Sequence, residues 1–299
     1  MQRRNFIKNT SLFAFGVSVT GNIRFTNGHF EGLTATTTDV LGPFYRPGAP
    51  MRKNVIPAGS NGEIMHLAGT IFKDDGTTPY QDCLVEIWQC SPEGIYDNTS
   101  NDYNFRGALT TGADGKYHFI TTIPVAYPTD EAKKYYRPAH VHMRISGKQE
   151  QDLVTQIYFT GDPYIKTDTY AKSPQAVNRI LSIKKNNKNE NTLQFDVMMT
   201  KEFKLDDAVF DKVAGIYNMS DKTMVEFYKS GDLLFVKING QIMEALYYKG
   251  NNNFTSAMDL VKVQFELKEK GVVKTMIEYQ DDSNKWVKTD GLKLLKYKS

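Results

Sequence analysis

The sequence predicts an all-β protein with two modules, a β-sandwich followed by a small antiparallel meander or barrel. Short apolar runs alternate with turn signals such as Asp74-Asp75-Gly76, which is typical of sandwiches and barrels. All 11 prolines fall at or before Pro174, and all 5 histidines fall at or before His142. This shift in composition places the sandwich at residues 29–203 and the second module at residues 207–299.

The strands of the first module are expected to be short. The run from Cys83 to Cys90 reads as one strand, and the odd separation puts the two thiols on opposite faces, too far apart for a disulfide. Ser173-Pro174 predicts the start of a helix that runs to Ile183. A last strand is expected at 192–199. The side chains expected in the sandwich core are Leu84, Ile87, Trp88, Tyr117, Phe119 and Ile123.

The second module alternates more clearly between apolar and polar residues. Strands are expected at 224–228, 233–238, 261–267 and 273–279, with a hairpin break at Asn239-Gly240. The module contains no histidine or cysteine, and we find no catalytic constellation in it. Ligand binding and simple packing against the first module both remain open. We favour packing, and we expect the module to be dispensable for the chemistry.

The first residues resemble a bacterial twin-arginine export signal, which we place at residues 1–28. Arg3 and Arg4 precede Phe6-Ile7-Lys8 and then the apolar stretch Leu12–Val17, which is too short to cross a bilayer. The alternative is a basic N-terminus on a cytosolic protein. We expect export to the periplasm or the medium, and no other segment is apolar enough over sufficient length to cross a membrane.

Charge and motifs exclude several classes of function. Lys and Arg number 37 against 34 Asp and Glu, for a net charge of +3, which is too balanced for a protein that must neutralise many phosphates. The sequence contains no Gly-x-Ser-x-Gly motif and no glycine-rich phosphate loop. We therefore expect no nucleic-acid partner, no serine hydrolase chemistry and no dinucleotide cofactor.

His140 and His142 are the two histidines that lie close together in the sequence. Pro138 argues against a helix, and residues i and i+2 of a strand project from one face, where two imidazoles can bind one metal ion. No histidine follows His142 to complete a zinc-hydrolase or cupin site. The first module is rich in tyrosine, whose phenolate is a hard anionic ligand suited to Fe(III). The alternative is a pair of polar residues on a solvent-facing strand.

A set of short segments carries a resemblance to a known family. The segments are Leu41-Gly-Pro-Phe-Tyr-Arg-Pro47, Leu84-Val-Glu-Ile-Trp-Gln89, Gly94-Ile-Tyr96, 107–119, Tyr127-Pro128, Arg137-Pro-Ala-His-Val-His142, Thr155-Gln-Ile-Tyr-Phe159 and Gly161-Asp-Pro163. Together they resemble the intradiol ring-cleavage dioxygenases, the family of protocatechuate and catechol dioxygenases, over roughly Thr38 to Thr200. The resemblance implies a prealbumin-like sandwich and a non-haem Fe(III) enzyme that uses O2 to convert a catechol-type ring to a muconate-type diacid.

The resemblance also implies the metal ligands by motif. One Fe(III) per chain would be held by Tyr96, Tyr127, His140 and His142. Tyr127 is implied to be the ligand that the substrate displaces and that accepts a substrate proton, whereas the other three hold the metal throughout.

The resemblance suggests roles for four further residues. Arg137 is implied to stabilise the anionic, ketonised substrate, and Gln156 to be a polar neighbour in the site. A surface salt bridge and an ordinary strand residue are the respective alternatives. Pro43 and Tyr45 are expected to line the pocket entrance, although Gly-Pro-Phe-Tyr could equally form a packed turn.

Two rival functions remain open at this point. A non-catalytic prealbumin-like sandwich would bind a phenolic or carbohydrate ligand without turnover, and a different metal at the same ligands would give hydrolase or storage behaviour. The short segment before Gly42 resembles the protocatechuate type more than the catechol type, and it leaves the oligomer open, a homo-oligomer included. Gly215-Ile-Tyr217 resembles the start of lipocalin-like β modules.

Overall fold

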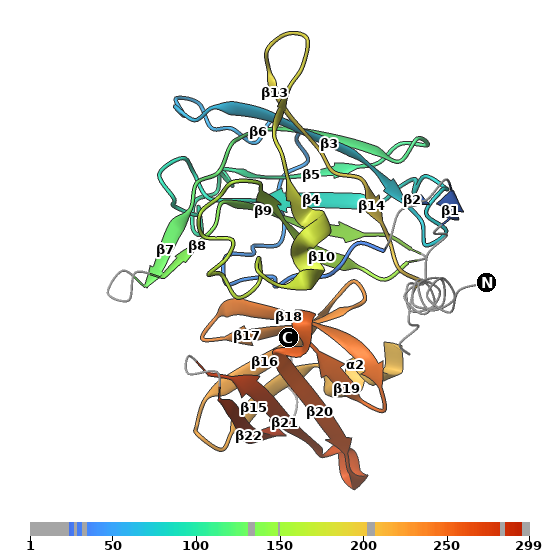
Figure 1. Cartoon of the computed structure of the whole chain (residues 1–299). Coiled ribbons are helices and arrows are strands. Elements are labelled where there is room, and N and C mark those ends of the chain that lie inside the picture. The colour runs from blue at the N-terminus through green and yellow to red at the C-terminus, as the bar shows by residue number, and fades with distance from the viewer. Residues whose placement is uncertain are drawn as a thin grey trace, which may run out of the picture.

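The computed structural model describes residues 24–26, 29–31, 35–130, 135–148, 150–201, 207–281 and 285–294. The described chain is nearly all β and forms a sandwich followed by a closed barrel (Figure 1), which confirms the fold class expected from the sequence. The predicted export signal lies almost entirely outside the described residues. None of the helices in the described ranges has the length and apolar character needed to cross a membrane.

The sandwich consists of two sheets. The first sheet contains β4 (Leu84–Trp88), β5 (Arg106–Thr110), β9 (His140–Ser146), β10 (Leu153–Phe159) and β11 (Ile180–Leu181), in the spatial order β11-β10-β9-β4-β5. The second contains β3 (Ile64–Phe72), β6 (Lys116–Thr122), β12 (Lys184–Lys185), β13 (Asn191–Gln194) and β14 (Val197–Met198), with β6 and β13 on opposite edges of β3. Two separate ribbons pair β1 (Arg24–Thr26) with β2 (His29–Glu31), and β7 (Tyr127–Asp130) with β8 (Tyr135–Arg137).

The two faces of the first sheet have different surroundings because side chains alternate along each strand. The residues of β9 in the core between the sheets are Val141, Met143 and Ile145. His140, His142 and Arg144 therefore project from the opposite face. On that face His142 lies across from Trp88 of β4 and from Gln156 of β10. The alternation thus separates the core of the sandwich from its candidate site.

Trp88 is not a core residue of the sandwich, contrary to the sequence expectation. Ile87 lies in the core cluster between the sheets, whereas Trp88 lies in a second hydrophobic cluster on the outward face. Adjacent residues of a strand point to opposite sides, so the two side chains cannot share one core. Cys83 and Cys90 are both buried and free, as predicted. Other core residues that were predicted correctly are Tyr117 and Phe119.

Two predicted elements are shorter than expected. The helix is a single 3₁₀ segment, η1 (Pro174–Arg179), capped by the Ser173 hydroxyl. It ends there because Ile180–Leu181 pairs in parallel with β10. The strand expected at 192–199 is broken between β13 and β14, where the Asp196 carboxylate accepts a hydrogen bond from a β3 backbone amide.

The second module is a closed barrel of eight strands. The strands are β15 (Gly215–Met219), β16 (Met224–Ser230), β17 (Leu233–Ile238), β18 (Gln241–Gly250), β19 (Asn253–Thr255), β20 (Val261–Leu267), β21 (Val273–Gln280) and β22 (Trp286–Lys293), with α2 (Asp207–Val213) and the short η2 (Ala257–Asp259) and η3 (Glu269–Gly271). All four predicted strands are present. The sequence interpretation missed α2, β15, β18, β19 and β22, and the lipocalin resemblance stays a prediction.

Aromatic side chains fill the interior of the barrel. The rings of Tyr217, Phe227, Phe254 and Phe265 contact one another with centroid separations from 5.1 to 5.7 Å. Phe210 of α2 joins them, 6.1 Å from Phe254. This filling favours packing over an internal ligand, the alternative that the sequence left open.

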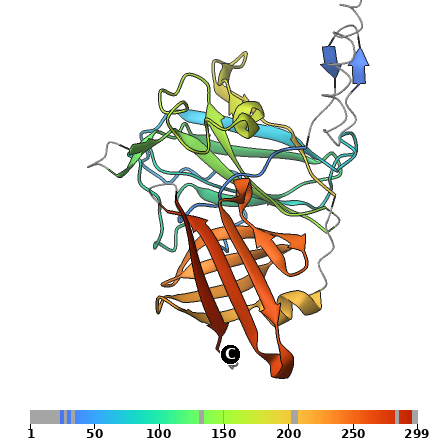
Figure 2. The ribbon, with the colours of Figure 1, turned by 60° about the horizontal axis from the view of Figure 1, so that its bottom comes forward.

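The barrel packs against the outward face of the first sheet. In Figures 1 and 2 it lies below the sandwich, and Figure 1 shows β17 and β18 on its side toward the sandwich. Leu233 and Phe235 of β17 belong to the same hydrophobic cluster as Trp88. The Val154 amide of β10 donates a hydrogen bond of 3.0 Å to the Tyr247 hydroxyl of β18. The two modules therefore share one buried interface.

The core of the sandwich can be tested with matched isoleucine substitutions. Ile157 is fully buried on the core face of β10, whereas Ile64 is 54% exposed at the start of β3. We expect Ile157→Ala to lower the free energy of unfolding by about 2–5 kcal/mol, because it leaves a cavity. Ile64→Ala should change the free energy of unfolding by about 0.5 kcal/mol or less. Urea unfolding of both variants measures the difference, and equal losses would contradict the assigned core.

Candidate metal centre

Four side chains named by the sequence converge in one buried cluster. The Tyr96 hydroxyl lies 3.1 Å from His140 Nε2, which lies 3.1 Å from His142 Nε2. The Tyr127 ring meets the Tyr96 ring edge to face at 5.5 Å and lies 5.6 Å from the His140 ring. All four side chains are buried. The structure thus brings together residues from the loop after β4, from β7 and from β9.

The tautomer of His140 leaves a nitrogen lone pair that is available to a cation. His140 Nδ1 lies 2.6 Å from the Pro138 carbonyl, which can only accept, so Nδ1 carries the proton and the Nε2 of a neutral ring carries a lone pair. That lone pair faces His142 Nε2. If His142 is protonated on Nε2, it can donate a hydrogen bond to this lone pair, but its buried Nδ1 then has no hydrogen-bond partner among the described residues. A metal ion bound by both Nε2 lone pairs would leave Nδ1 of His142 to carry the proton, and that atom has no partner among the described residues in either state.

Burial sets the protonation states of the four donors. It raises the pKa of Tyr96 well above its usual value and also raises the pKa of Tyr127. It lowers the pKa of His140 and of His142 well below the usual value, and the charge of Arg137 lowers both further. The imidazoles are therefore neutral and ready to bind a metal, whereas the phenols need a nearby cation in order to ionise.

The donor set fits one transition-metal ion. Phenolate oxygen is a hard donor, and imidazole binds several first-row metals. Within the described ranges, no group of three or more His, Cys, Asp and Glu side chains forms a metal site. The two phenols are therefore required to complete a set of four donors.

Two aromatic side chains that the sequence interpretation did not assign to the site hold the donors in place. Phe44 stacks on Tyr96 with 4.3 Å between ring centres and meets Tyr127 edge to face at 6.3 Å. Trp88 stacks on His142 at 4.8 Å with the ring planes 7° apart. Signals for both were present, since Phe44 lies inside the 41–47 motif and Trp88 precedes Gln89 in another.

Arg106 fixes the loop that carries Tyr96. Its guanidinium is buried and donates hydrogen bonds to the carbonyls of Asp97 (2.9 Å) and Phe44 (2.7 Å) and to the Asn98 side chain (3.1 Å). One side chain therefore binds both the residue after Tyr96 and the residue that stacks on Tyr96.

Arg137 and Gln156, both named by the sequence, are hydrogen-bonded to each other beside the cluster. Arg137 Nη2 donates to Gln156 Oε1 at 2.8 Å and to the Tyr158 hydroxyl at 3.2 Å, and its Nε donates to Asp168 at 2.7 Å. Gln156 Nε2 in turn donates to the Val40 carbonyl at 2.7 Å. The guanidinium is thus held charged and fixed near the donors, and it is not a surface ion pair.

A buried ion pair supports the hydrogen bonds around Arg137. Asp39 and Arg179 are almost completely inaccessible, and Arg179 Nη1 donates to the Asp39 carboxylate. The same carboxylate accepts a bond of 3.0 Å from the Tyr158 hydroxyl, and Arg179 donates to the Gln156 carbonyl at 2.8 Å. The pair therefore anchors the strand residues that position Arg137.

Pro43 and Tyr45 lie toward the barrel. The Tyr45 hydroxyl accepts a hydrogen bond of 2.9 Å from Arg144 and donates to Glu86. Together with barrel residues such as Gln241, both line an open cavity of about 790 Å³ between the modules. They flank Phe44 on the side of the interface, and a role for them in binding substrate stays a prediction.

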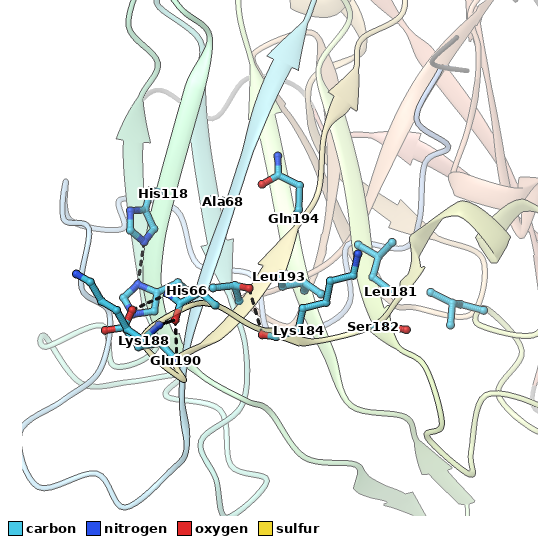
Figure 3. A pocket seen from close by; sticks show the side chains of 13 residues that line it. His66, Ala68, His118, Leu181, Ser182, Lys184, Lys188, Glu190, Leu193 and Gln194 are labelled. Atoms are coloured by element: carbon cyan, nitrogen blue, oxygen red, sulfur yellow. Dashed lines mark hydrogen bonds between the residues drawn. The ribbon is translucent and has the colours of Figure 1, made fainter. Parts of the chain in front are cut away.

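A second hollow lies on the other sheet and contains two histidines. Figure 3 shows His66 of β3 and His118 of β6 pointing toward each other, with Glu190 beside His66. The nitrogens Nδ1 of His66 and Nε2 of His118 are 3.0 Å apart, in a cavity of about 750 Å³. Burial and then the charge of Lys53 lower the pKa of His118, and Lys188 also lines the hollow. This lysine-rich setting opposes a cation, so the buried four-donor cluster is the stronger candidate.

Comparison with known proteins points to one family. A family model described as "Dioxygenase" matches residues 40–206, which is more than half of the chain. The matched range contains all four donors, as well as Arg137 and Gln156. It ends just before the barrel.

Individual relatives agree with this match. The chain is 36% identical to hydroxyquinol 1,2-dioxygenase of Rhizobium sp. (strain MTP-10005) over 158 residues, covering 47% of this chain and 53% of that protein. It is 35% identical to catechol 1,2-dioxygenase 1 of Acinetobacter lwoffii over 160 residues, covering 46% and 50%. The chain thus spans about half the length of these curated relatives. The solved structure of catechol 1,2-dioxygenase from Pseudomonas arvilla C-1 aligns at a TM-score of 0.50 and 26% identity, over 56% of this chain and 63% of that one.

The support beneath the site can be tested by breaking the buried pair. Arg179→Met should lower the free energy of unfolding by about 3–5 kcal/mol, because the Asp39 carboxylate is left buried without its counterion. Adding Asp39→Asn should recover part of this loss. Lys237→Met, which breaks a half-exposed pair with Glu226 at 3.4 Å, should cost about 1 kcal/mol or less. Urea unfolding provides the comparison. Equal losses of unfolding free energy in Arg179→Met and Lys237→Met would show that the Asp39–Arg179 pair does not support the site.

Proposed function

The chain belongs to the intradiol ring-cleavage dioxygenase family, and on that premise we propose that it cleaves a catechol-type aromatic ring with O2 to give a muconate-type diacid. The observation that carries the proposal is the convergence of two phenol oxygens and two imidazole nitrogens in one buried cluster. The similarity to proteins named for catechol and hydroxyquinol supports a substrate with two adjacent hydroxyl groups.

The cofactor that this donor set supports is one Fe(III) ion per chain. Tyr96, Tyr127, His140 and His142 would hold it. A bound ferric ion supplies Lewis acidity, which draws electron density from the dihydroxylated ring and makes the ring reactive toward O2. The protein residues supply the remaining functions of the site, which are charge balance, orientation and exclusion of water.

Tyr127 is the residue we assign to proton transfer. It lies on the two-stranded β7–β8 ribbon and not in either sheet, and its ring contacts that of Tyr96. Burial raises the pKa of Tyr127, and the positive charge of Arg137 opposes that rise. As a phenolate, Tyr127 Oη accepts the proton of a substrate hydroxyl, so the substrate can bind as an anion while the charge of the site is unchanged.

Arg137 is the residue we assign to stabilising negative charge on the substrate. Its guanidinium is fixed by Asp168 and Gln156, so it needs no reorganisation when charge develops on a ring oxygen. Tyr96 and His142 stay in place because Phe44 and Trp88 stack on them, and the hydrogen bond to the Pro138 carbonyl holds His140.

The rival functions receive less support. A sandwich that only binds a ligand has no need for four donors buried against each other. The leader-like sequence at residues 1–28 supports the further proposal that the protein is exported through the twin-arginine route.

The metal can be tested directly on the purified protein. We expect about one ferric ion per chain and a visible colour, since phenolate-to-Fe(III) charge transfer absorbs visible light. His140→Ala and His142→Ala should each lose iron, because each removes one nitrogen donor. Elemental analysis and the visible spectrum measure both effects, with Ile64→Ala as a surface control. Colourless protein that holds stoichiometric zinc would remove the dioxygenase proposal.

The two tyrosines can be distinguished by their spectra. Tyr127→Phe keeps the ring and its packing but removes the proton acceptor, so turnover should fall while the spectrum of the anaerobic, substrate-saturated protein stays close to wild type. Tyr96→Phe removes a phenolate that remains bound, so that same spectrum should change. Spectra of both variants with a catechol that is turned over provide the measurement. If Tyr127→Phe alters the spectrum as much as Tyr96→Phe does, the division of roles is wrong.

A further inference from the structure

The candidate metal centre and the barrel share one face of the first sheet. His142 and Arg144 are two residues apart on β9, so they project from the same side. Arg144 donates hydrogen bonds to the Ser230 hydroxyl at 3.1 Å and the Ser230 carbonyl at 2.9 Å, in the barrel. Its guanidinium lies 5.1 Å from the centre of the Phe235 ring. The barrel thus contacts the position next to a donor histidine on that face.

One face of the segment 41–45 is fixed by β18 of the barrel. Gln241 Nε2 donates a hydrogen bond of 2.8 Å to the Pro43 carbonyl. The Glu244 carboxylate faces the Leu41 amide, which opposes the rise that burial causes in the pKa of Glu244. Leu41, which is fully buried, lies in one hydrophobic cluster with barrel side chains. Both polar contacts fix the backbone of the segment and do not depend on its side chains.

The other face of the same segment contacts the donors. A Cβ atom on Gly42 would lie 3.2 Å from His142 Cε1, so the backbone is already at contact distance from the imidazole. Gly42 has a φ of +75°, which favours glycine. Phe44 stacks on Tyr96. The segment is therefore a single layer of chain between the barrel and two of the four donors.

We infer that the β17–β18 ribbon of the barrel positions the metal centre, and that Gln241 and Glu244 are positioning residues that act through segment 41–45. The inference rests on the proposed function for the identity of the metal, but the geometry of the cluster does not depend on that identity. It replaces the sequence expectation that the second module is dispensable for the chemistry. The filled interior of the barrel is consistent with this inference, because the barrel would position the metal centre through its outer surface and would need no internal cavity.

Trp88 supplies a readout that needs neither metal nor activity. The chain has two tryptophans. Trp88 is buried against His142, whereas Trp286 is 45% exposed on β22. In a Trp286→Phe background, quenching of Trp88 fluorescence by acrylamide therefore reports how well the barrel and segment 41–45 cover the site.

The experiment compares four full-length variants in that background. Gln241→Ala and Glu244→Ala each remove one contact to the segment. Glu244→Gln keeps an oxygen that can accept a hydrogen bond from the Leu41 amide. Gln264→Ala is the surface control, because Gln264 is an exposed residue of β20 in a hollow lined by barrel residues alone. Circular dichroism and thermal unfolding establish that each variant is folded. If Glu244→Ala does not fold, the exposed Gln241→Ala still removes a contact without leaving a buried defect.

We expect Gln241→Ala and Glu244→Ala to increase quenching of Trp88 in the metal-free protein. Both should also speed the loss of iron to a chelator about tenfold, as is typical when a group that orients a metal ligand is removed. Glu244→Gln and Gln264→Ala should match the background protein in both measurements. Equal quenching and equal iron loss in all four variants would overturn the inference. If the parent protein takes up no iron, the proposed function fails, and the quenching comparison still decides the role of the barrel.

Discussion

The alternation of side chains along β9 is the constraint on which the other features depend. Because successive residues face opposite sides, one strand can place apolar side chains in the sandwich core and polar side chains outside it. The outward face then carries two imidazoles, His140 and His142, followed by Arg144, which binds the barrel. A shift of one residue in the register of β9 would bury the imidazoles between the sheets and would abolish both the site and the interface.

Much of the fold and the four donors could be predicted from the sequence. Period-two patterns located β20 and β21 correctly, and the motifs named side chains that the structure brings within hydrogen-bonding distance of each other. Phe44 and Trp88 were not assigned to the site, because an aromatic residue in a motif looks the same whether it fills a core or covers a ligand. Only the pairing of Trp88 with His142 across two strands distinguishes these cases.

The interface between the modules could not be predicted, for a different physical reason. Leu233-Leu-Phe-Val236 is an unbroken apolar run, and such a run indicates a strand buried on both faces. The pattern does not show what covers the second face. Leu234 and Val236 pack in the interior of the barrel, whereas Leu233 and Phe235 pack against the sandwich. Contacts of this kind join residues far apart in the chain, so no local period encodes them.

The order of the chain has a consequence for how the protein is made. The donors end at His142, and the barrel strands that cover the site begin at Leu233. A ribosome that adds residues at 5–20 per second needs about 5 to 20 seconds to cross the roughly 90 residues between them. During that time the chain first adds β10 and β11 to the sheet, and it then carries all four donors with the outward face of that sheet still open. Metal ions in the compartment of synthesis can therefore reach the site before the barrel that closes over it exists.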